Sequence, residues 1–488
     1  MKITVITITT LVFLNLSFGQ NANSVQETII DFTENSSLKN AAISFAAYDI
    51  EEGKIIASHN PAMALPPAST VKLFSTALAF ETLGSNYIPK TRFYHTGKID
   101  STGVLHGDLI IRGGGDPSLG SRFFTNKENR NEFLNEWSAL ISASGIKSIR
   151  GNIVADASDF GYEGAPDGWS WSDLGNYYGS GPSGLVIYDN MTKLHFSTSA
   201  GINEPTYLDS MTPPVKGYQL MNSVITYSSK RDNCYIYGAP FSYDRFAVGN
   251  LPNNKKNFEV KASIPDPELM TAQVFINKLN SDSIFVSGDA IGQREQLKAG
   301  NSAINYDDCN LIDTYGKTSI KDIAFWTNLR SVNLFAEQLL SLVAYKKTGL
   351  GELQKGANYS NSYWEPRLNI EMFQTDGSGL SRSNGFSAMQ FIKLLAYMKK
   401  SRHFEDFKST LPIAGKSGTL RGVCRGQAAS NRLFAKSGTM NRIKSYAGYV
   451  ESVSGKQIAF AIIVNNDNLS NYNLVKQMEK VFNAMASY

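Results

Sequence analysis

The strongest constraint on the fold is a change of pattern along the chain: its two ends combine helix-forming and strand-forming segments, whereas its long middle part does not. Residues 41–60 contain two apolar-rich stretches around a short polar turn, which predicts a β-hairpin. A helix is predicted from Thr70 to Leu83, because Gly84 closes an apolar run there. The N-terminal part therefore opens with a hairpin followed by a helix.

Similar elements return toward the C-terminus. Six apolar residues follow the spacing of a helix that faces a core: Val332, Phe335, Ala336, Leu339, Leu340 and Val343. Residues 432–439, 445–453 and 456–466 predict three strands, and residues 474–485 predict a last amphipathic helix. These elements can complete the domain that the N-terminal hairpin and helix begin.

Between these ends, short alternating segments are separated by Gly, Pro, Asp and Asn, as in β-rich modules. One helix is predicted among them, Glu268–Leu279, with Asp266 as its N-cap. We therefore predict an α/β (α+β) domain that is interrupted by a large β-rich insertion. The predicted boundaries are 20–90 plus 300–488 for the discontinuous domain and 91–299 for the inserted domain or domains.

Residues 1–19 have the pattern of a secretory signal peptide. Lys2 is followed by an apolar run that ends at Leu16, and small residues precede a cleavage point before Gln20. The run is shorter than the roughly 20 apolar residues that a membrane-spanning helix needs. We expect a secreted protein with no integral membrane segment after cleavage.

Charge and cysteine content exclude several classes of partner. The formal charge of +4 is small for 488 residues, and Lys and Arg are scattered, so no nucleic-acid partner is expected. Cys234, Cys309 and Cys424 lie far apart, which fits neither a disulfide framework nor a zinc site. We expect no metal and no other cofactor.

Ser69 and Lys72 lie at the predicted start of the first helix. A hydroxyl and an amine at this spacing share one face of a helix and can meet. A lysine can take the serine proton if its pKa, about 10.4 when unperturbed, is lowered. The same Ser-x-x-Lys spacing occurs at Ser36 and Ser144, so the pattern alone is a weak indication. Only the copy at Ser69 has a Pro-Pro-Ala lead-in and a long apolar helix after it.

Two further motifs follow in chain order. Ser331-Val332-Asn333 precedes the second long helix, where an ordinary N-cap is the alternative interpretation. A Lys-Ser-Gly run then occurs twice, at Lys416 and at Lys436. We assign the copy at Lys436, because two predicted strands follow it, whereas Pro and Gly near Lys416 indicate turns. Ser-x-x-Lys, Ser-x-Asn and Lys-Ser-Gly in this order are a known signature of serine β-lactamases and penicillin-binding proteins.

Further segments extend the resemblance over residues 40–465. PPASTVKLFSTALAFETLG, RGGGDPSL, DGWSWSD, SVNLFAEQLL, DGSGLSR and AKSGTM resemble the D-alanyl-D-alanine carboxypeptidase/endopeptidase family, the class C low-molecular-mass penicillin-binding proteins. The family's usual Ser-Asp-Asn is Ser-Val-Asn here, and a serine replaces the commoner threonine of the third motif. The resemblance implies a β-lactamase/transpeptidase-like domain that carries the site, with β-rich insertions. It also implies a periplasmic serine DD-peptidase that acts on peptidoglycan stem peptides and cross-links, and that penicillins inhibit.

The resemblance implies a role for each catalytic residue. Ser69 is expected to be the nucleophile that forms the acyl-enzyme, and Lys72 its general base. Ser331 is expected to relay a proton to the leaving amine, while Asn333 orients Lys72 and the substrate. The charge of Lys436 is expected to help keep Lys72 neutral.

Substrate-binding residues are implied in the same way. Lys436 and Ser437 are expected to hold the terminal carboxylate, with Gly438 on the same strand. The backbone N–H groups of Ser69 and Thr439 are expected to form the oxyanion hole.

A side-chain pocket is implied by the DGSGLSR motif. Arg382 is expected to help shape a pocket for the diamino acid of the stem peptide. Asp156, from the insertion, is expected to face it.

Other functions compete with this interpretation. Class A β-lactamases deacylate with the glutamate of a Glu-x-x-Leu-Asn loop, and Glu365 begins such a sequence between the second and third motifs. We expect this match to be coincidental, since those enzymes lack an insertion of this size. A non-catalytic peptidoglycan-binding protein is disfavoured because the motif residues are intact. The sequence contains neither the Gly-x-Ser-x-Gly elbow of Ser-His-Asp hydrolases nor the His-Glu-x-x-His motif of zinc proteases.

Overall fold

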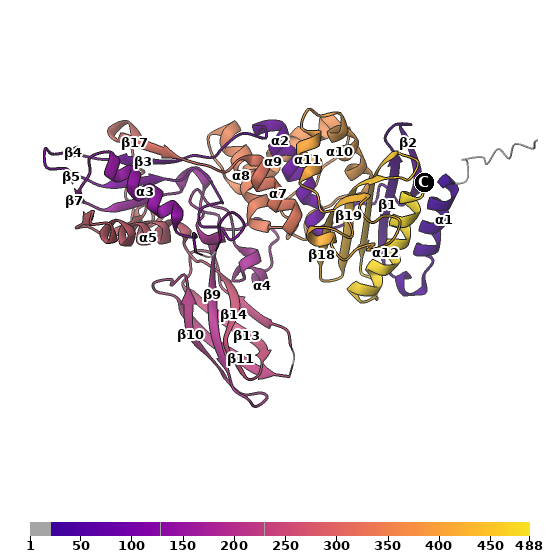
Figure 1. Cartoon of the computed structure of the whole chain (residues 1–488), viewed down its shortest axis with the longest axis horizontal. Helices are drawn as coiled ribbons and strands as arrows, with labels where there is room; N and C mark the ends of the chain where they lie inside the picture. The colour runs from indigo at the N-terminus through magenta and orange to yellow at the C-terminus, as the bar shows by residue number, and fades with distance from the viewer. Residues whose placement is uncertain (1–20, 127, 229) are drawn as a thin grey trace, which may run out of the picture.

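The computed structural model describes residues 21–488, apart from residues 127 and 229. The predicted signal peptide lies outside the described residues. Figure 1 shows an elongated molecule with an arm that projects from its middle. In the part of the chain that is described, no helix has the length and apolar character needed to cross a bilayer.

One end of the molecule is built around an antiparallel five-stranded sheet. Its strand order is β18-β19-β20-β1-β2. The strands are β1 (Ala42–Asp49), β2 (Lys54–His59), β18 (Leu433–Met440), β19 (Ile443–Glu451) and β20 (Gln457–Asn465). This confirms the N-terminal hairpin and the three C-terminal strands. Because β1 pairs with β20, the two ends of the chain form one sheet, as the split pattern of the sequence predicts.

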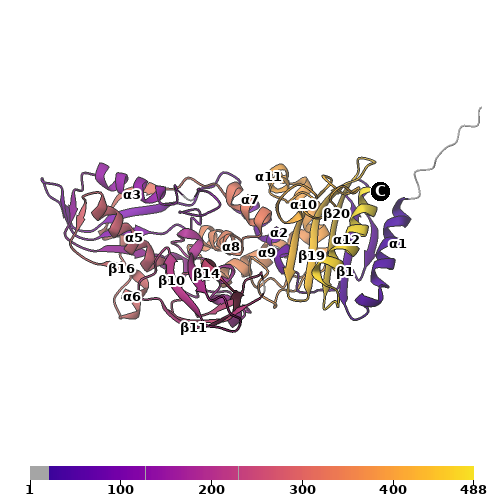
Figure 2. The same ribbon diagram turned by 60° about the horizontal axis from the view of Figure 1, so that its bottom comes forward.

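Helices cover both faces of this sheet (Figure 2). On one face lie α1 (Asn21–Thr33) and α12 (Asn471–Ala486), and on the other α2 (Lys72–Leu83), α8 (Asn333–Thr348) and α10 (Ala388–Lys400). The alternation of β20 explains this: Ala459, Ala461 and Ile463 join the core beneath α2 and α8, while the residues between them join the core beneath α1 and α12. The sheet is thus the middle layer of a three-layer domain.

The two helices that carry motif residues are more buried than the sequence predicts. α2 begins at Lys72, because a 3-10 turn, Ala68–Val71, replaces its expected first residues. In α8 the predicted apolar stripe is buried, but the polar residues Glu337, Gln338 and Ser341 are buried as well. Gln338 accepts a hydrogen bond at 3.2 Å from the backbone N–H of Ser183, which belongs to the insertion. The insertion therefore contacts Gln338, whereas Glu337 accepts from the N–H groups of Gly377 and Ser378, outside the insertion.

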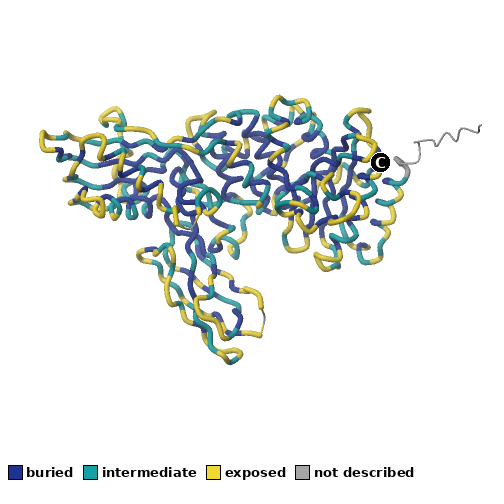
Figure 3. The backbone as a smooth tube through the Cα atoms, in the orientation of Figure 1, coloured by how far each residue is buried: buried dark blue, intermediate teal, exposed yellow. Residues whose placement is uncertain are grey.

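Three more helices lie on the same side of the sheet as α2 and α8. They are α7 (Ile320–Arg330), α9 (Leu353–Leu368) and α11 (Phe404–Ser409). All three pack on the same core as α2 and α8. Figure 3 shows this core as a continuous buried region through the middle of the molecule.

The opposite end of the molecule is a mixed sheet with the order β16-β8-β6-β3-β17. Its strands are β3 (Thr91–His95), β6 (Leu109–Arg112), β8 (Ile153–Asp156), β16 (Ala290–Gly292) and β17 (Asn310–Tyr315). A smaller sheet pairs β4 (Lys98–Ile99), β5 (Val104–His106), β7 (Ser148–Ile149) and β15 (Phe285–Val286). α5 (Pro267–Ser281) packs on this end, and Asp266 caps it by accepting from the N–H of Leu269 at 2.9 Å.

The prediction of a single helix in residues 91–299 is wrong. α3 (Glu132–Ala143) also packs on this end, and the short helices α4 (Trp171–Leu174) and α6 (Gln293–Lys298) occur too. The physical reason is the strand order: β6 and β8 pair in parallel, and parallel neighbours need a long crossover connection. α3 lies in that connection.

The arm in Figure 1 consists of two three-stranded sheets that share a small apolar core. One sheet has the order β10-β9-β14 and contains β9 (Met191–Thr198), β10 (Thr206–Thr212) and β14 (Lys255–Ser263). The other has the order β11-β13-β12 and contains β11 (Gln219–Tyr227), β12 (Asn233–Tyr237) and β13 (Asp244–Pro252). The domain boundaries at residues 90 and 300 stay a prediction. The pairing of β17 with β3 places residues 310–315 on the same sheet as strands from 91–292.

Candidate active site

Ser69 and Lys72 meet where α2 begins. Ser69 lies in the 3-10 turn and Lys72 is the first residue of the helix. The Nζ of Lys72 lies 2.9 Å from the Oγ of Ser69, which is hydrogen-bonding distance. The same Nζ donates to Oδ1 of Asn333 at 2.7 Å and to the carbonyl oxygen of Ser378 at 2.6 Å. Because Lys72 is fully buried, these oxygens hold its amine in one position beside the hydroxyl.

The second motif spans a break between two helices. Ser331 follows the last residue of α7 and has a left-handed backbone, with φ 59° and ψ 42°. This conformation is costly for a residue other than glycine and is often found at functional sites. Val332 is the N-cap of α8, so the interpretation of Ser331 as that cap is wrong. The Nζ of Lys436 lies 2.9 Å from the Oγ of Ser331, and Asn333 donates from Nδ2 to the carbonyl oxygen of Tyr178 at 2.9 Å.

The two Lys-Ser-Gly copies lie in different surroundings. Lys436 is fully buried on β18, next to Ser331, whereas Lys416 is exposed in a turn. The segment after Lys416 nevertheless reaches the site, because Oγ of Ser437 donates to Oγ1 of Thr419 at 2.8 Å. Sequence reasoning gave Thr419 no role, since no motif spacing connects it to β18.

Gly438 lets β18 approach the turn that carries the nucleophile. A Cβ at this position would lie 2.2 Å from Oγ of Ser445, 2.6 Å from the carbonyl oxygen of Pro67 and 3.0 Å from the backbone nitrogen of Ser69. Only glycine leaves room for contacts this close. The backbone nitrogen of Ser69 and the strand that bears Thr439 are therefore side by side, as an oxyanion hole requires.

Burial dominates the electrostatics of the site. It lowers the pKa of Lys72 to about 7, against an opposing effect of Asp376 and Glu337. It lowers the pKa of Lys436 well below the usual lysine range, and the nearby charges of Lys72 and Lys444 lower it further. Loss of hydration, and not the charge of Lys436 as expected, is therefore the main cause of the lowered pKa of Lys72. A lysine with a pKa near 7 is partly uncharged at neutral pH and can accept a proton.

The motif residues line a cleft of about 530 Å³. Ser69, Ser331, Asn333 and Thr439 all reach it. A volume in this range suits a peptide-sized ligand. The structure thus brings the three sequence motifs together around one open space.

Arg382 also lines this cleft, but its acidic neighbour differs from the one expected. Asp156 is 2% exposed, and its carboxylate accepts hydrogen bonds from the hydroxyl of Tyr306 at 2.5 Å and the N–H of Ser158 at 2.8 Å. It does not line the cleft, because it points into the sheet of the opposite end. Asp173 of the DGWSWSD segment does line the cleft, and the charge of Arg382 opposes the rise that burial causes in the pKa of Asp173.

The DGSGLSR and DGWSWSD segments together fix the loop that contains Ser378. The carboxylate of Asp376 accepts from the N–H groups of Gly379 and Ser381, each at 2.7 Å, and from Nε1 of Trp169 at 2.9 Å. The loop so fixed contains Ser378, whose carbonyl oxygen binds Lys72. The insertion therefore stabilises the loop that positions the amine.

Glu365, the match to the class A β-lactamase pattern, lies elsewhere. It is near the end of α9, where its carboxylate accepts from the N–H of Met372 at 3.1 Å. It does not line the cleft that contains Ser69. The geometry agrees with a coincidental match.

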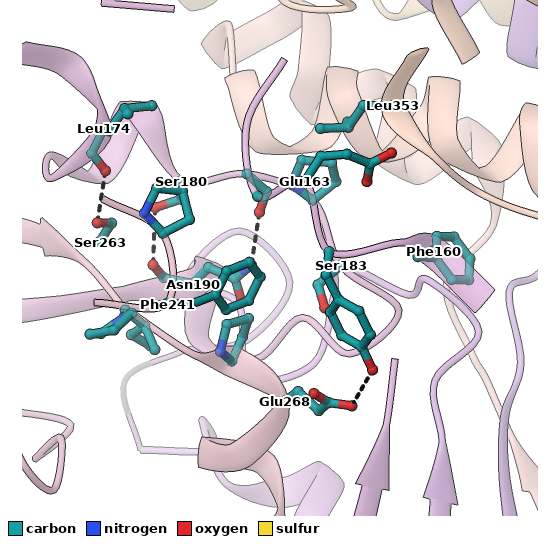
Figure 4. A pocket seen from close by; sticks show the side chains of 18 of the residues that line it. Phe160, Glu163, Leu174, Ser180, Ser183, Asn190, Phe241, Ser263, Glu268 and Leu353 are labelled. Carbon is teal, nitrogen blue, oxygen red and sulfur yellow. Dashed lines mark hydrogen bonds between the residues drawn. The ribbon is translucent and has the colours of Figure 1, made fainter. Parts of the chain in front are cut away.

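A small internal cavity of about 40 Å³ lies apart from the motifs (Figure 4). Glu268 is buried in its wall, where it accepts from the hydroxyl of Tyr162 at 2.9 Å, and burial raises the pKa of Glu268 to about 8. The cavity has room for a few water molecules and none for a peptide. It is not a candidate for the reaction site.

Comparisons with known proteins agree with the geometry. Residues 25–485 match the sequence profile of the D-Ala-D-Ala carboxypeptidase 3 (S13) family. A D-alanyl-D-alanine carboxypeptidase of Actinomadura sp. (strain R39) is 26% identical over 462 residues, which cover 92% of this chain and 82% of that protein. The D-alanyl-D-alanine carboxypeptidase DacB of Haemophilus influenzae is 26% identical over 442 residues, covering 87% of this chain and 85% of the relative.

A solved structure has the same fold. Penicillin-binding protein 4 (dacB) from Haemophilus influenzae superposes with a TM-score of 0.78 at 22% sequence identity, over 94% of this chain and 99% of that one. The predicted fold class, a transpeptidase-like α/β domain with a large insertion, is thereby confirmed. The profile match over nearly the whole described chain shows that this protein belongs to the D-Ala-D-Ala carboxypeptidase 3 (S13) family and is a serine-type DD-peptidase.

Proposed function

We propose that this enzyme hydrolyses the D-Ala-D-Ala ends and the D-Ala cross-links of peptidoglycan stem peptides through an acyl-enzyme on Ser69. The observation that carries the proposal is the 2.9 Å contact between Ser69 Oγ and a fully buried Lys72, whose pKa burial lowers to about 7. Such a pair can form an alkoxide-like nucleophile at neutral pH without a histidine.

In the acylation step, the uncharged amine of Lys72 takes the proton of Ser69 as Oγ attacks the carbonyl carbon of the penultimate D-Ala. The developing oxyanion lies between the backbone N–H groups of Ser69 and Thr439. Ser331, which Nζ of Lys436 contacts at 2.9 Å, passes its proton to the nitrogen of the leaving amine. It takes up in exchange the proton that Lys72 removed from Ser69, so that Lys72 is uncharged again before deacylation. The C–N bond breaks, and the leaving D-Ala or peptide departs with a free amine.

Deacylation reverses these roles with water. A water molecule loses its proton to Lys72 as it attacks the ester, and Ser69 regains its own hydrogen when the ester C–O bond breaks. Lys72 acts as the proton acceptor in both half-reactions. No metal or cofactor takes part in either of them.

The carboxylate of the leaving D-Ala is assigned to β18. Oγ of Ser437, the hydroxyl of Thr439 and the amine of Lys436 supply hydrogen bonds and charge. Thr419 supports Ser437 through the 2.8 Å contact between their hydroxyls.

We assign the side chain of the diamino acid to Arg382 and Asp173, not to Asp156. A diamino acid side chain that ends in an amine and a carboxylate can pair with both of them. Both residues line the cleft that contains Ser69. The finding that supports Asp173 is this shared cleft, which Asp156 does not reach.

We also propose that β-lactams acylate Ser69 and leave it slowly. A structure of the Haemophilus influenzae penicillin-binding protein 4 in complex with a β-lactam has the same fold, with a TM-score of 0.74 and 21% identity. Glu365 is not placed to activate a deacylating water. The N-terminal signal pattern and the peptidoglycan substrate place the enzyme in the periplasm in this proposal.

Product analysis tests the proposed reaction. Purified muropeptide monomers with a D-Ala-D-Ala end should lose one D-Ala, and cross-linked dimers should be split into monomers, as measured by mass spectrometry. Ser69→Ala should abolish both reactions, while Ser36→Ala, which changes the equally spaced serine near the N-terminus, should leave both unchanged. Release of D-Ala by the Ser69→Ala variant would contradict the proposal.

A further inference from the structure

A second pocket, of about 630 Å³, opens from the same motif on the side away from Ser69. It shares Tyr177, Tyr178, Ser331 and Asn333 with the cleft, but Ser69, Arg382 and Thr439 line only the cleft. Its other walls come from the end of α7 and from β9 and β14, where the arm joins the rest of the molecule (Figure 1). The two spaces are therefore neighbours that share Ser331 as a wall residue.

The lining of this pocket is rich in cations. Arg122, Lys261 and Arg330 line it, against one carboxylate, Asp189. Asp189 is already engaged: its carboxylate accepts from Oγ of Ser121 at 2.5 Å and forms an ion pair with Nε of Arg122 at 3.6 Å. Among the described residues, neither Lys261 nor Arg330 has a carboxylate within ion-pair distance. The pocket thus holds more cationic than anionic side chains, and two of its cations form no ion pair within the described part of the chain.

An aromatic ring, that of Tyr177, lies close to two of these cations. The ring of Tyr177 lies 5.5 Å from the guanidinium carbon of Arg122 and 5.4 Å from Nζ of Lys261. Burial, and after it the charges of Arg122 and Lys193, lower the pKa of Lys261, while Glu259 and Asp232 oppose this change, so the net effect of the surroundings disfavours the cation. An anion that enters between the cations offsets this effect, which is the electrostatic condition for an anion-binding site.

We propose that this basic pocket binds the carboxylates of the stem peptide on the leaving side of a cross-link. This inference rests on the proposed function, in which Ser331 protonates the leaving amine. A leaving D-Ala ends at the carboxylate that β18 binds. The leaving group of a cross-link is a second peptide with several carboxylates, and it has to extend beyond Ser331. The basic pocket shares Ser331 with the cleft but contains neither Ser69 nor Arg382.

The basic pocket therefore favours endopeptidase action over removal of a single D-Ala. The chemistry is unchanged: water is added across one amide bond, and the leaving amine receives its proton from Ser331. The pocket adds charge-assisted hydrogen bonds that only the larger leaving group can make. Its contribution appears in the affinity for cross-linked substrate.

The test compares two substrates on the same variants. Lys261→Met and Arg330→Gln remove charges that have no ion-pair partner among the described residues, and Lys278→Met is the control, because Lys278 pairs with Asp282 at 2.7 Å and does not line the pocket. With cross-linked dimers, the double variant should lose about tenfold in kcat/KM, through KM. With monomeric pentapeptide and with penicillin acylation it should stay within about twofold, which also shows that the variant is folded.

A modified substrate sharpens the test. Dimers whose leaving-strand carboxylates are amidated should be cleaved equally well by the wild type and the double variant. Equal losses of the double variant on dimer and pentapeptide would overturn the inference, and so would an unchanged kcat/KM on the dimer. Failure of the proposed function has a different result, in which the wild-type enzyme cleaves neither substrate.

Discussion

Lys72 and Lys436 lie in the same buried site, but each contacts a different serine. Lys72 contacts Ser69, and Lys436 contacts Ser331, in both cases at 2.9 Å. Together with Asn333 they make up the five expected catalytic side chains. The order and spacing of the motifs identify all of them directly in the sequence except Lys436. Lys-Ser-Gly occurs at Lys416 and at Lys436, and only the strands predicted after Lys436 identify that copy as the third motif.

The two copies of Lys-Ser-Gly give a direct comparison. Lys436→Ala should reduce the rate of acylation by penicillin about 10²-fold or more, because it removes a buried charge and donor that act in the transition state. Lys416→Ala should stay within about threefold, since a solvated surface charge contributes little. Stopped-flow acylation of both variants measures this. If the effects were exchanged, the assignment of the third motif would be wrong.

The pKa of Lys72 sets the pH dependence. Lys72 must be uncharged to accept the Ser69 proton, and burial lowers its pKa to about 7. The acylation rate should therefore be low at acidic pH, rise through about pH 7 and level off above it. Penicillin acylation measured between about pH 5 and 9 tests this. A rate that keeps rising toward the ordinary lysine pKa, about 10.4, would show that burial does not control the base.

Two residues of the site could not be predicted from the sequence. Thr419 follows a Lys-Ser-Gly copy that lies in a turn, and its contact with Ser437 depends on how that turn folds back on β18. Asp173 is one of several acidic residues in the insertion, and only the packing of α4 near the cleft singles it out. Asp156 was a reasonable choice from position in the chain, but β8 directs it into the opposite end of the molecule.

At the scale of elements, the sequence analysis predicts the sheet but not the crossover helix α3, although Phe133, Leu134, Trp137 and Ile141 of that helix follow helical spacing. The strands β1, β19 and β20 are buried on both faces, and the nearly continuous apolar runs of β1 and β20 predict such strands. α3 was missed because Gly- and Asp-rich turns on both sides of it favoured a β-rich interpretation. The parallel pairing of β6 with β8, which requires such a helix, is a property of the folded sheet and leaves no local signal.

The close approach of β18 to the nucleophile turn can be tested at Gly438. Gly438→Ala would place a methyl group 2.6 Å from the carbonyl oxygen of Pro67 and 2.2 Å from Oγ of Ser445. The strand has to move, so acylation should fall by at least about tenfold, since displacements near 1 Å are costly to catalysis. Gly422→Ala is a control, because nothing lies within 4 Å of its added Cβ. Unchanged acylation in Gly438→Ala would show that the contact does not position the site.

At the scale of the whole molecule, the insertion is part of the active site. It supplies Asp173 and Tyr235 to the cleft, and Trp169 holds Asp376 in the loop that positions Lys72. It also contacts α8, where the N–H of Ser183 donates to Gln338. The split of the catalytic domain by a large insertion was predicted from the sequence, whereas this close packing of the insertion against the site was not.

Substitutions of Asp173, from the insertion, and of Arg382, which lines the same cleft, should slow the cleavage of peptide substrates more than acylation by penicillin. Asp173→Asn and Arg382→Ala should each lower kcat/KM for stem peptides with a diamino acid by about tenfold, because a charged partner of the side chain is lost. Acylation by a simple penicillin, which has no such side chain, should change by less than about threefold. Asp156→Asn is the matched control and should not discriminate between the two. Equal losses on both ligands would show that Arg382 and Asp173 only support the fold.

The most direct test of the central claim is the site and the lifetime of the penicillin adduct. The wild-type enzyme, treated with penicillin and digested, should carry the adduct on the peptide that contains Ser69, and the adduct should persist after free penicillin is removed. Ser69→Ala should carry none, and Glu365→Ala should behave like the wild type. Labelling that survives Ser69→Ala, or rapid turnover of penicillin that Glu365→Ala abolishes, would contradict the account.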